Sequence, residues 1–281
     1  MSEERHVTAA DDKLVSYDPI WRALKTQAEE LAQGEPALAS FAHATILRHE
    51  RLEEALAYHL ARKIGGENLS TLQVHEIFLE AFAEDPSIGA ALRADLSAVF
   101  QRDPACASYA QAFLFFKGFH ALQCYRAAHW LWFNDRKIMA LYFQNRMSDL
   151  FSVDVHPAAR LGRGIMIDHA TGVVIGETAV VEDEVSILHD VTLGGTGKEE
   201  EDRHPKVRRG VLIGVGAKIL GNIEIGQYSR VGAGSVVIKP VPPHTTVAGV
   251  PARVIGSADS ECPSQDMDHR LSGWETYDPS I

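Results

Sequence analysis

The chain has 281 residues, of which 46% are hydrophobic, and its formal net charge is −11. That length suits one large domain or two modest ones, and the hydrophobic content is sufficient for a packed core. The negative charge argues against a general surface for nucleic acid or anionic membrane, because both need a positive field. A local basic site remains compatible with this acidic background.

The cysteines and the N-terminal residues indicate the cellular compartment. Cys106, Cys124 and Cys262 are the three cysteines, and no Cys-x-x-Cys pair occurs. A sparse, odd set predicts reduced thiols in the cytosol and not a disulfide framework. The first dozen residues are polar and expected to be disordered, with no apolar signal-peptide segment. No apolar run approaches the roughly 20 residues that span a bilayer. We therefore expect a soluble, cytoplasmic protein.

The first half of the chain, from about residue 19 to residue 150, is predicted to be helical. Between Leu38 and Leu60, apolar side chains recur at intervals of three and four, which is the spacing of one helix face. Residues 113–143 are rich in aromatic side chains, which we interpret as helix-packing core or an oligomer contact. Turn residues separate the helical segments at 34–36, 65–66, 85–86 and 103–104. We expect residues 1–150 to form one helical domain.

After residue 150 the spacing of aliphatic residues changes to six. A fixed repeat of this length is typical of a parallel β-helix, in which three repeats close a triangular coil of about 18 residues. The recurring side chain points inward, and glycine is favoured beside it where the turn needs positive φ or close backbone approach. We predict a β-helix over 151–256 and a flexible tail over 257–281. The aliphatic residues on this register are Ile175, Val181, Ile187, Leu193, Ile213, Ile219, Ile225, Val231 and Val237.

The register is interrupted between Leu193 and Ile213, which are 20 residues apart, a gap that is not a multiple of six. The intervening residues 194–206 are polar and charged. A solenoid tolerates insertions only as loops that leave its faces, and long excursions from a regular scaffold are often functional. The interruption is therefore a first indication of a site.

A carboxylate and an imidazole at the start of the repeat form a candidate acid–base pair. Asp154 and His169 are 15 residues apart, close to one coil, so the two side chains can lie on adjacent levels. A carboxylate that accepts from one ring nitrogen fixes the tautomer and leaves the other nitrogen as a general base. We predict this pairing near the inserted loop.

With these segments in view, the sequence resembles the bacterial serine acetyltransferases over nearly its whole length. The repeat alone indicates only the hexapeptide-repeat acyltransferases, whereas Asp-His-Ala-Thr-Gly at 168–172 and Asp-Arg-His-Pro-Lys at 202–206 narrow the resemblance to this family. The resemblance implies a helical N-terminal domain for substrate contact and oligomerisation, followed by a left-handed β-helix. The segments that carry it are 117–123, 154–159, 162–166, 168–172, 191–198, 202–206, 241–246 and 248–253.

The resemblance assigns a role to each matching side chain. His169 is expected to be the general base that takes the proton of the serine hydroxyl, with Asp154 as its orienting partner. Asp103 and Asp168 are expected to contact the substrate amino group, and Arg203 and His204 to bind its carboxylate. These roles suit a free amino acid, because its cation and its anion each need an opposite charge.

The reaction implied is direct transfer of the acetyl group from acetyl-CoA to the hydroxyl of L-serine, giving O-acetyl-L-serine and CoA, the first step of cysteine biosynthesis. Acetyl-CoA is then a co-substrate, and no permanently bound cofactor or metal is expected. Glycine-rich turns are candidates to hold the developing oxyanion with backbone N–H groups. The candidate contacts of the coenzyme are Gly195, Thr196, Val215, Lys218 and Arg253.

The resemblance also implies partners. Trimers of β-helices, joined in pairs through the helical domains, would give a hexamer with active sites between neighbouring β-helices. L-Cysteine is expected to compete with serine as a feedback inhibitor, because it shares the charged groups of serine. The terminal Ile281 is expected to insert into O-acetylserine sulfhydrylase, where its side chain and carboxylate form a compact anchor.

Three alternatives stay open at this point. A metal hydratase on the same scaffold would use His156, His169, His189 and His204 as zinc ligands across a subunit interface. A scaffold without catalysis would bind the sulfhydrylase through the tail, although it would not need the set of Asp154, His169 and Arg203. A different acceptor, such as an amino sugar, would keep the coenzyme and change the acceptor pocket.

Overall fold

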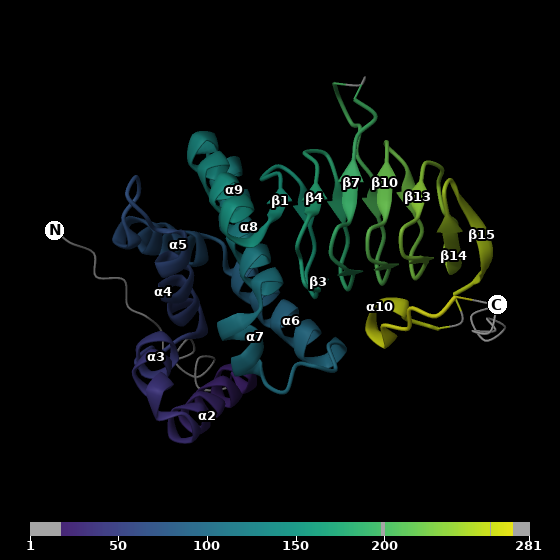
Figure 1. Cartoon of the computed structure of the whole chain (residues 1–281). Helices are drawn as coiled ribbons and strands as arrows, with labels where there is room; N and C mark the ends of the chain where they lie inside the picture. The colour runs from purple at the N-terminus through teal and green to yellow at the C-terminus, as the bar shows by residue number, and fades with distance from the viewer. Residues whose placement is uncertain (1–17, 198–199, 259, 272–281) are drawn as a thin grey trace.

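The structure is a computed structural model and describes residues 18–197, 200–258 and 260–271. Figure 1 shows a helical half and a regular coil of short strands that stand side by side, with α8 and α9 next to the first coil. The helices are α2 (Pro19–Gly34), η1 (Pro36–Leu38), α3 (Ala39–Ala42), η2 (His43–Leu47), α4 (Leu52–Ile64), α5 (Thr71–Glu84), α6 (Pro86–Arg102), α7 (Tyr109–Phe115), α8 (Lys117–Phe133), α9 (Lys137–Phe151) and α10 (Pro263–Asp266).

The helices begin and end near the predicted turn residues because local capping satisfies their free backbone groups. The side chain of Ser70 accepts from the backbone N–H of Gln73 at the start of α5. Asp85 closes α5 and caps α6, whose first residue is Pro86. The prediction of helices through the first half of the chain is confirmed.

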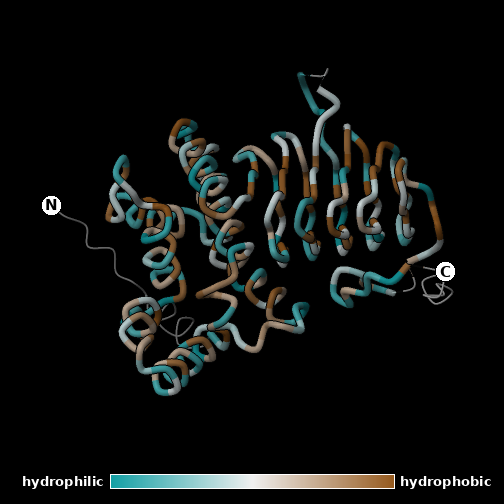
Figure 2. The backbone as a smooth tube through the Cα atoms, in the orientation of Figure 1, coloured by the Kyte–Doolittle hydropathy of each residue, from teal (hydrophilic) through white to brown (hydrophobic). Residues whose placement is uncertain are grey.

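The strands wind into three parallel sheets, and the predicted period of six is confirmed. All nine aliphatic residues on the register are buried, with at most 2% of their surface exposed. Their side chains form the apolar interior of the coil, where brown segments recur along the tube in Figure 2. The strands are β1 (Val153–Val155), β2 (Arg160–Leu161), β3 (Met166–Ile167), β4 (Val173–Ile175), β5 (Val180–Val181), β6 (Ser186–Ile187), β7 (Thr192–Gly194), β8 (Lys206–Val207), β9 (Leu212–Ile213), β10 (Lys218–Leu220), β11 (Glu224–Ile225), β12 (Arg230–Val231), β13 (Val236–Val237), β14 (Thr245–Gly249) and β15 (Ala252–Ser257).

Each sheet takes one strand from every coil, in the orders β1-β4-β7-β10-β13, β2-β5-β8-β11 and β3-β6-β9-β12-β14. The antiparallel strand β15 closes the last of these three sheets. Glycines beside the buried aliphatics allow neighbouring coils to approach closely. A Cβ at Gly214 would lie 2.7 Å from the backbone nitrogen of Ala233, although the φ of this glycine is not positive. Close approach, not positive φ, therefore explains this glycine.

The strand register locates two insertions in the regular coil. Lys206 pairs with Glu224, which is the regular 18 positions further. Val180 pairs with Lys206, 26 positions further, because eight extra residues leave the coil as a loop between β7 and β8. Arg160 pairs with Val180, 20 positions further, and the two extra residues lie in the turn between β3 and β4. The loop projects from one edge of the coil in Figure 1.

The helical half and the first coil share one apolar core, and buried polar contacts also join them. Asp95 of α6 accepts from Arg126 of α8 and from the backbone N–H of Ile165 in the coil. At the start of α8, Gly118 lies so close to the turn after β3 that a Cβ there would be 2.0 Å from the carbonyl oxygen of Ile167. These contacts fix the helices against the residues that follow β3.

Beyond β15 the chain returns along the sheet that contains β9. Helix α10 contacts both α6 and β9, and the hydroxyl of Ser186 donates to the carbonyl of Ser264. The expected flexible tail is therefore docked over residues 260–271, and its predicted anchor, Ile281, lies outside the described residues, as does the polar N-terminal dozen. No helix of the described chain is long and apolar enough to cross a membrane.

A pair of buried histidines lies inside the helical half. The rings of His59 and His120 contact each other edge-on at 4.9 Å. Burial lowers the pKa of His59 from 6.5 to about 3, with the cation of Lys63 acting in the same direction. Burial also lowers the pKa of His120 well below its ordinary value, and the neighbouring His59 adds to this shift. Both rings are therefore neutral in the folded protein near pH 7.

This pair predicts that the protein loses stability as the pH falls below about 6.5. The unfolded chain then binds protons that the folded chain excludes, and at pH 5 each histidine costs about 2 kcal/mol of unfolding free energy. Replacing His59 with Phe should reduce the slope of unfolding free energy against pH between 7 and 5, measured by chemical denaturation. An unchanged slope would show that His59 does not contribute.

Candidate active site

His169 lies in the two-residue insertion between β3 and β4. This insertion turns the chain sharply, because His169 and Ala170 both adopt the left-handed backbone conformation, with φ of 54° and 62°. The backbone N–H of Thr171 donates to the carbonyl of His169, which closes the turn. The His169 side chain is 72% exposed, so its ring is accessible to a substrate. Residues 168–172, with the side chains gathered around them, are called the His169 corner below.

Two carboxylates and a cation surround this corner. The Nε2 atom of His169 is 3.6 Å from a carboxylate oxygen of Asp168. A cavity of about 350 Å³ is lined by both residues and, across from them, by Asp103 at the end of α6 and Lys117 at the start of α8. The ammonium of Lys117 donates to the hydroxyl of Thr171, which ties α8 to the turn. The structure therefore brings Asp103, Asp168 and His169 to one cavity.

His189 occupies the equivalent turn one coil further along. Its ring meets that of His169 edge-to-face, with centroids 5.5 Å apart and planes at 82°. The Nδ1 atom of His189 is buried and has no hydrogen-bond partner among the described atoms. This contact supports one side of the exposed imidazole of His169.

Arg203 and His204 lie at the base of the inserted loop. They are near the C-terminal end of strand β4, whereas His169 lies before its N-terminal end. Arg203 donates from one terminal nitrogen to the carboxylate of Glu177 at 2.6 Å. Its other terminal nitrogen donates to the backbone carbonyls of Glu200 and Glu201, at 3.0 and 3.1 Å. A guanidinium has five N–H donors, so two remain for a further carboxylate. We call this group of side chains, with Asp154 and His156, the Arg203 corner.

His204 is held in one orientation at this corner. The backbone N–H of Thr178 donates to its Nδ1 atom at 3.2 Å, so the proton of the neutral ring is on Nε2. The ring packs over Gly176, where a Cβ would lie 2.0 Å from Nε2. Burial lowers the pKa of His204, and the cations of Arg203 and Lys206 add to this effect. The ring is therefore neutral at pH 7 and presents an N–H donor.

Asp154 belongs to the Arg203 corner and not to the His169 corner. Its carboxylate accepts from the side-chain amide of Gln144 in α9 at 2.7 Å. Burial lowers the pKa of His156, and the negative charges of Glu177 and Asp154 offset part of this shift. The described hydrogen bonds and ion pairs of Asp154 and His169 do not join these two residues within one chain.

Strand β4 separates the two corners. His169 lies four residues before β4, whereas Gly176, which His204 covers, directly follows it. A three-residue strand is roughly 10 Å long, which exceeds the reach of one small amino acid. Within one chain the two corners therefore lie at opposite ends of strand β4, in the sheet β1-β4-β7-β10-β13.

The candidate coenzyme contacts in the coil are also divided between the two corners. Gly195 packs against the side chain of Arg203, and Thr196 lies at the start of the loop. The ammonium of Lys218 bonds to the carboxylate and carbonyl of Asp190 at the opposite edge, with Val215 in the preceding turn. Arg253 is exposed on β15 and donates to the neighbouring carbonyl of Ala252.

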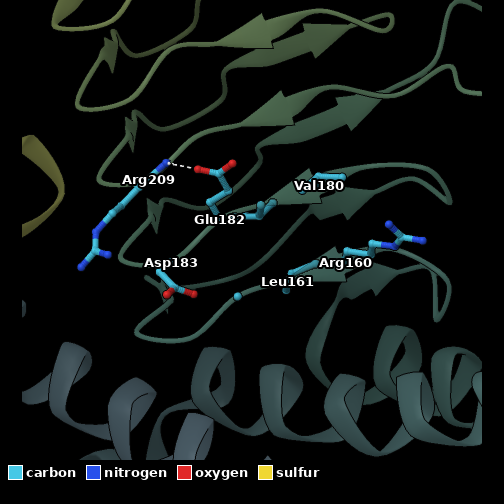
Figure 3. Close-up of a pocket in the computed structure, with 8 residues that line it drawn as sticks. Arg160, Leu161, Val180, Glu182, Asp183 and Arg209 are labelled. Atoms are coloured by element: carbon cyan, nitrogen blue, oxygen red, sulfur yellow. Dashed lines mark hydrogen bonds between the residues drawn. The ribbon is translucent and has the colours of Figure 1, made fainter. Parts of the chain in front are cut away.

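A larger cavity of about 450 Å³ lies elsewhere, on the outer face of the sheet β2-β5-β8-β11. Figure 3 shows Arg160 and Arg209 extending from opposite sides of it, with Glu182 accepting from the backbone N–H of Arg209. The residues that line it include none of the predicted site residues. Its acidic and basic side chains balance, so it does not favour one charge of ligand.

The structure adds contacts of residues to which the sequence assigned no role, although Lys117 belongs to the segment 117–123 that carries the resemblance. Glu177 and Gln144 contact the predicted residues Arg203 and Asp154, and Lys117 contacts the turn of His169. Glu177 directly follows the conspicuous Ile175-Gly176 pair and could have been noted on that basis. Gln144 and Lys117 come from helices, and no repeat in the sequence relates them to the coil.

The four histidines of the zinc alternative are divided between the corners, two at each. Among residues 18–197, 200–258 and 260–271, no group of three or more His, Cys, Asp or Glu side chains is arranged to hold a metal ion. A zinc site would therefore have to combine the histidines of two chains.

A parallel β-helix of six-residue repeats with an exposed histidine at a corner is the arrangement expected of the hexapeptide-repeat acyltransferases. Comparison with known proteins agrees with this class. Residues 204–239 match the family model described as bacterial transferase hexapeptide (six repeats), and residues 20–124 match the model described as serine acetyltransferase, N-terminal.

Whole-chain relatives narrow the class to one family. A serine acetyltransferase of Escherichia coli is 56% identical over 254 residues, which cover 90% of this chain and 93% of the relative. The chain belongs to the serine acetyltransferase family. Its activity is transfer of the acetyl group from acetyl-CoA to the hydroxyl of L-serine, which gives O-acetyl-L-serine for cysteine biosynthesis. The non-catalytic scaffold, the metal hydratase and the other acceptors are thereby set aside.

Solved structures support the same conclusion for the fold. The serine acetyltransferase of Vibrio cholerae superposes with a TM-score of 0.89 at 58% identity, over 90% of this chain and 98% of the other. A serine acetyltransferase in complex with cysteine gives 0.88 at 52% identity, over 90% and 98%. The enzyme of Brucella abortus in complex with coenzyme A gives 0.85 at 53%, over 87% and 98%. The expected left-handed β-helix behind a helical half is confirmed.

Proposed function

We propose that each active site forms between two copies of the chain, from the His169 corner of one and the Arg203 corner of the next. Serine needs a general base and a partner for each of its two charges. One chain holds these groups at opposite edges of a sheet, with β4 between them. In a ring of copies around an axis parallel to the coil, the His169 corner of one chain lies beside the Arg203 corner of the next chain. Three copies close this ring.

At the His169 corner, His169 is the general base, and Asp103 and Asp168 bind the ammonium of serine. Their shared cavity is the observation that carries this assignment. At the Arg203 corner, the two remaining N–H donors of Arg203 and the Nε2–H of His204 bind the serine carboxylate. Asp154 of this corner then accepts from the imidazole of the neighbouring chain and orients it.

The reaction proceeds by direct attack. The serine oxygen forms a bond to the thioester carbonyl carbon while its proton passes to His169, which contributes on the order of 10²–10⁴ in rate. The tetrahedral intermediate then breaks its carbon–sulfur bond, and the CoA thiolate takes the proton from His169. Backbone N–H groups of the glycine-rich turns stabilise the oxyanion. No side chain is acetylated in this sequence.

Acetyl-CoA lies along the coil beside the two corners. Its contacts are Gly195, Thr196, Val215, Lys218 and Arg253. The coenzyme complex of the Brucella relative supports binding to this fold. Because Lys218 already neutralises Asp190, its contribution to binding phosphate is weaker than that of a free lysine.

We divide the chain into three parts by function. Residues 1–150 are the helical domain, 151–256 the catalytic β-helix and 257–281 the tail. We place two trimers in a hexamer through their helical domains. The exposed apolar side chains of Phe133 and Ile138 at the tip of the α8–α9 pair are available for contacts between copies. The three cysteines are free, which supports the proposal of a cytoplasmic location.

Mixing two inactive variants tests the shared site. His169→Ala and Arg203→Ala should each lower serine acetylation by two orders of magnitude or more, measured as CoA release. Co-assembled, they should recover about a quarter of wild-type activity, because mixed trimers then contain one interface with both corners intact. Recovery of no activity from verified mixed oligomers would show that one chain supplies the whole site.

Cysteine should inhibit by competing with serine. It carries the same ammonium and carboxylate, which Asp103, Asp168 and Arg203 would bind, and a relative has been solved with cysteine bound. Raising the serine concentration should therefore relieve inhibition in steady-state assays, and Arg203→Ala should weaken inhibition together with serine binding. Inhibition that serine does not relieve would place cysteine at another site.

Deletion of Ile281 should abolish capture of O-acetylserine sulfhydrylase, because a C-terminal side chain and carboxylate form a compact anchor. The assay is a pull-down with purified sulfhydrylase, and acetyltransferase activity of the shortened chain serves as the control. Unchanged capture would show that the tail is not the anchor.

A further inference from the structure

Two buried arginines join the helical half to the same short segment of the first coil. Arg126 of α8 is 8% exposed, pairs with Asp95 and donates to the carbonyl of Gly162 at 2.8 Å. Arg102 is 5% exposed, pairs with Glu184 and donates to the carbonyl of Gly164 at 3.0 Å. The two arginines are similarly buried, each pairs with a carboxylate, and they bond to carbonyls two residues apart on the coil. Their partners differ, because Asp95 is fully buried and the side chain of Glu184 is 26% exposed.

They differ in what lies next to them. Arg102 is the last residue of α6, and the next residue, Asp103, is its C-cap, so their Cα atoms are 3.8 Å apart. The described hydrogen bonds of Asp103 are all local, to Val99, Ala105 and Cys106. The residue next to this carboxylate in the chain, Arg102, is therefore the nearest side-chain link between Asp103 and the β-helix, in addition to the link that Asp95 of α6 makes with Ile165.

The other side of the cavity depends on the same anchor. Gly164, which accepts from Arg102, precedes β3, and Asp168 directly follows this two-residue strand. Arg102 also donates to the hydroxyl of Ser186 at 3.1 Å, in the strand β6 that pairs with β3. The guanidinium of Arg102 thus bonds to the first coil at Gly164 and to the second coil at Ser186, close to Asp168. Arg102 also directly precedes Asp103 in the chain.

We propose that Arg102 is a positioning residue for the reaction, which sets the distance between Asp103 and Asp168 so that both carboxylates meet the ammonium of serine. This inference rests on the proposed role of Asp103. The planar fork of arginine satisfies Glu184, Ser186 and Gly164 together, and the single ammonium of lysine cannot reproduce that arrangement. Arg126 performs the same structural joining without a site residue beside it.

The test compares Arg102→Lys with Arg126→Lys in the full-length enzyme. Both variants should lower the melting temperature, because each weakens a buried ion pair. Arg102→Lys should raise KM for serine about 10-fold, because a small misplacement of a substrate-binding group has a large effect. Its KM for acetyl-CoA should stay within about twofold of the wild-type value, and Arg126→Lys should change neither KM by more than about twofold. Ser186→Ala, which removes one acceptor, should shift KM for serine in the same direction by a smaller factor.

A double-mutant cycle separates positioning from general destabilisation. Asp103→Asn should itself raise KM for serine, and adding Arg102→Lys to it should cause little further change, because the carboxylate to be positioned is gone. The positioning role would be overturned if the two changes raised KM for serine additively. It would also be overturned if Arg102→Lys and Arg126→Lys had equal KM values for serine. If Asp103→Asn leaves KM for serine unchanged, the assignment of Asp103 itself fails, and this outcome is distinct from failure of Arg102 alone.

Discussion

Burial of one aliphatic side chain every six residues is the constraint on which the rest of the structure depends. The interior of the coil is narrow, and these side chains share it with a second buried row that includes Val173, Ala179, Val185 and Val191. Each of them must therefore point inward, and the strands between them cannot lengthen or shift. Extra residues can therefore enter only at the corners. The chain has two such insertions, of two and eight residues, and each one carries side chains that the proposed reaction needs. The fold thus separates a rigid frame from the positions where chemistry can be placed.

The sequence predicted the frame better than the site, and the reason is physical. The spacing of apolar residues is a local signal, six in the coil and three to four in the helices. Both spacings match the structure, because these side chains are buried along the chain. The pairing of Asp154 with His169 was predicted from a spacing of about one coil. Adjacent levels of a solenoid do not imply the same corner, and within one chain Asp154 instead meets Gln144 from a helix. Contacts between the helical half and the coil, such as that of Arg102 with Gly164, leave no periodic trace in the sequence.

The helical half acts on the site through its attachment to the first coil. Asp103 and Lys117 reach the cavity from the end of α6 and the start of α8, and both of these helices contact β3. The close approach at Gly118 requires a residue without a side chain, since a Cβ would meet the carbonyl of Ile167. The helices therefore complete the cavity that the turn of His169 begins.

In the proposed site, which two copies of the chain would share, the charges of the two corners suit a free amino acid. The His169 corner has an excess of carboxylate, whereas Arg203 at the other corner is already partly neutralised by Glu177, and its hydrogen bond lowers the pKa of Glu177. Glu177 thus holds the guanidinium in place before substrate arrives and still leaves two N–H donors unused. Serine can then add its carboxylate without displacing Glu177, while its ammonium neutralises the opposite corner. Under this proposal, a zwitterion that bridges two copies meets an opposite charge at each corner, which a ligand of a single charge cannot do.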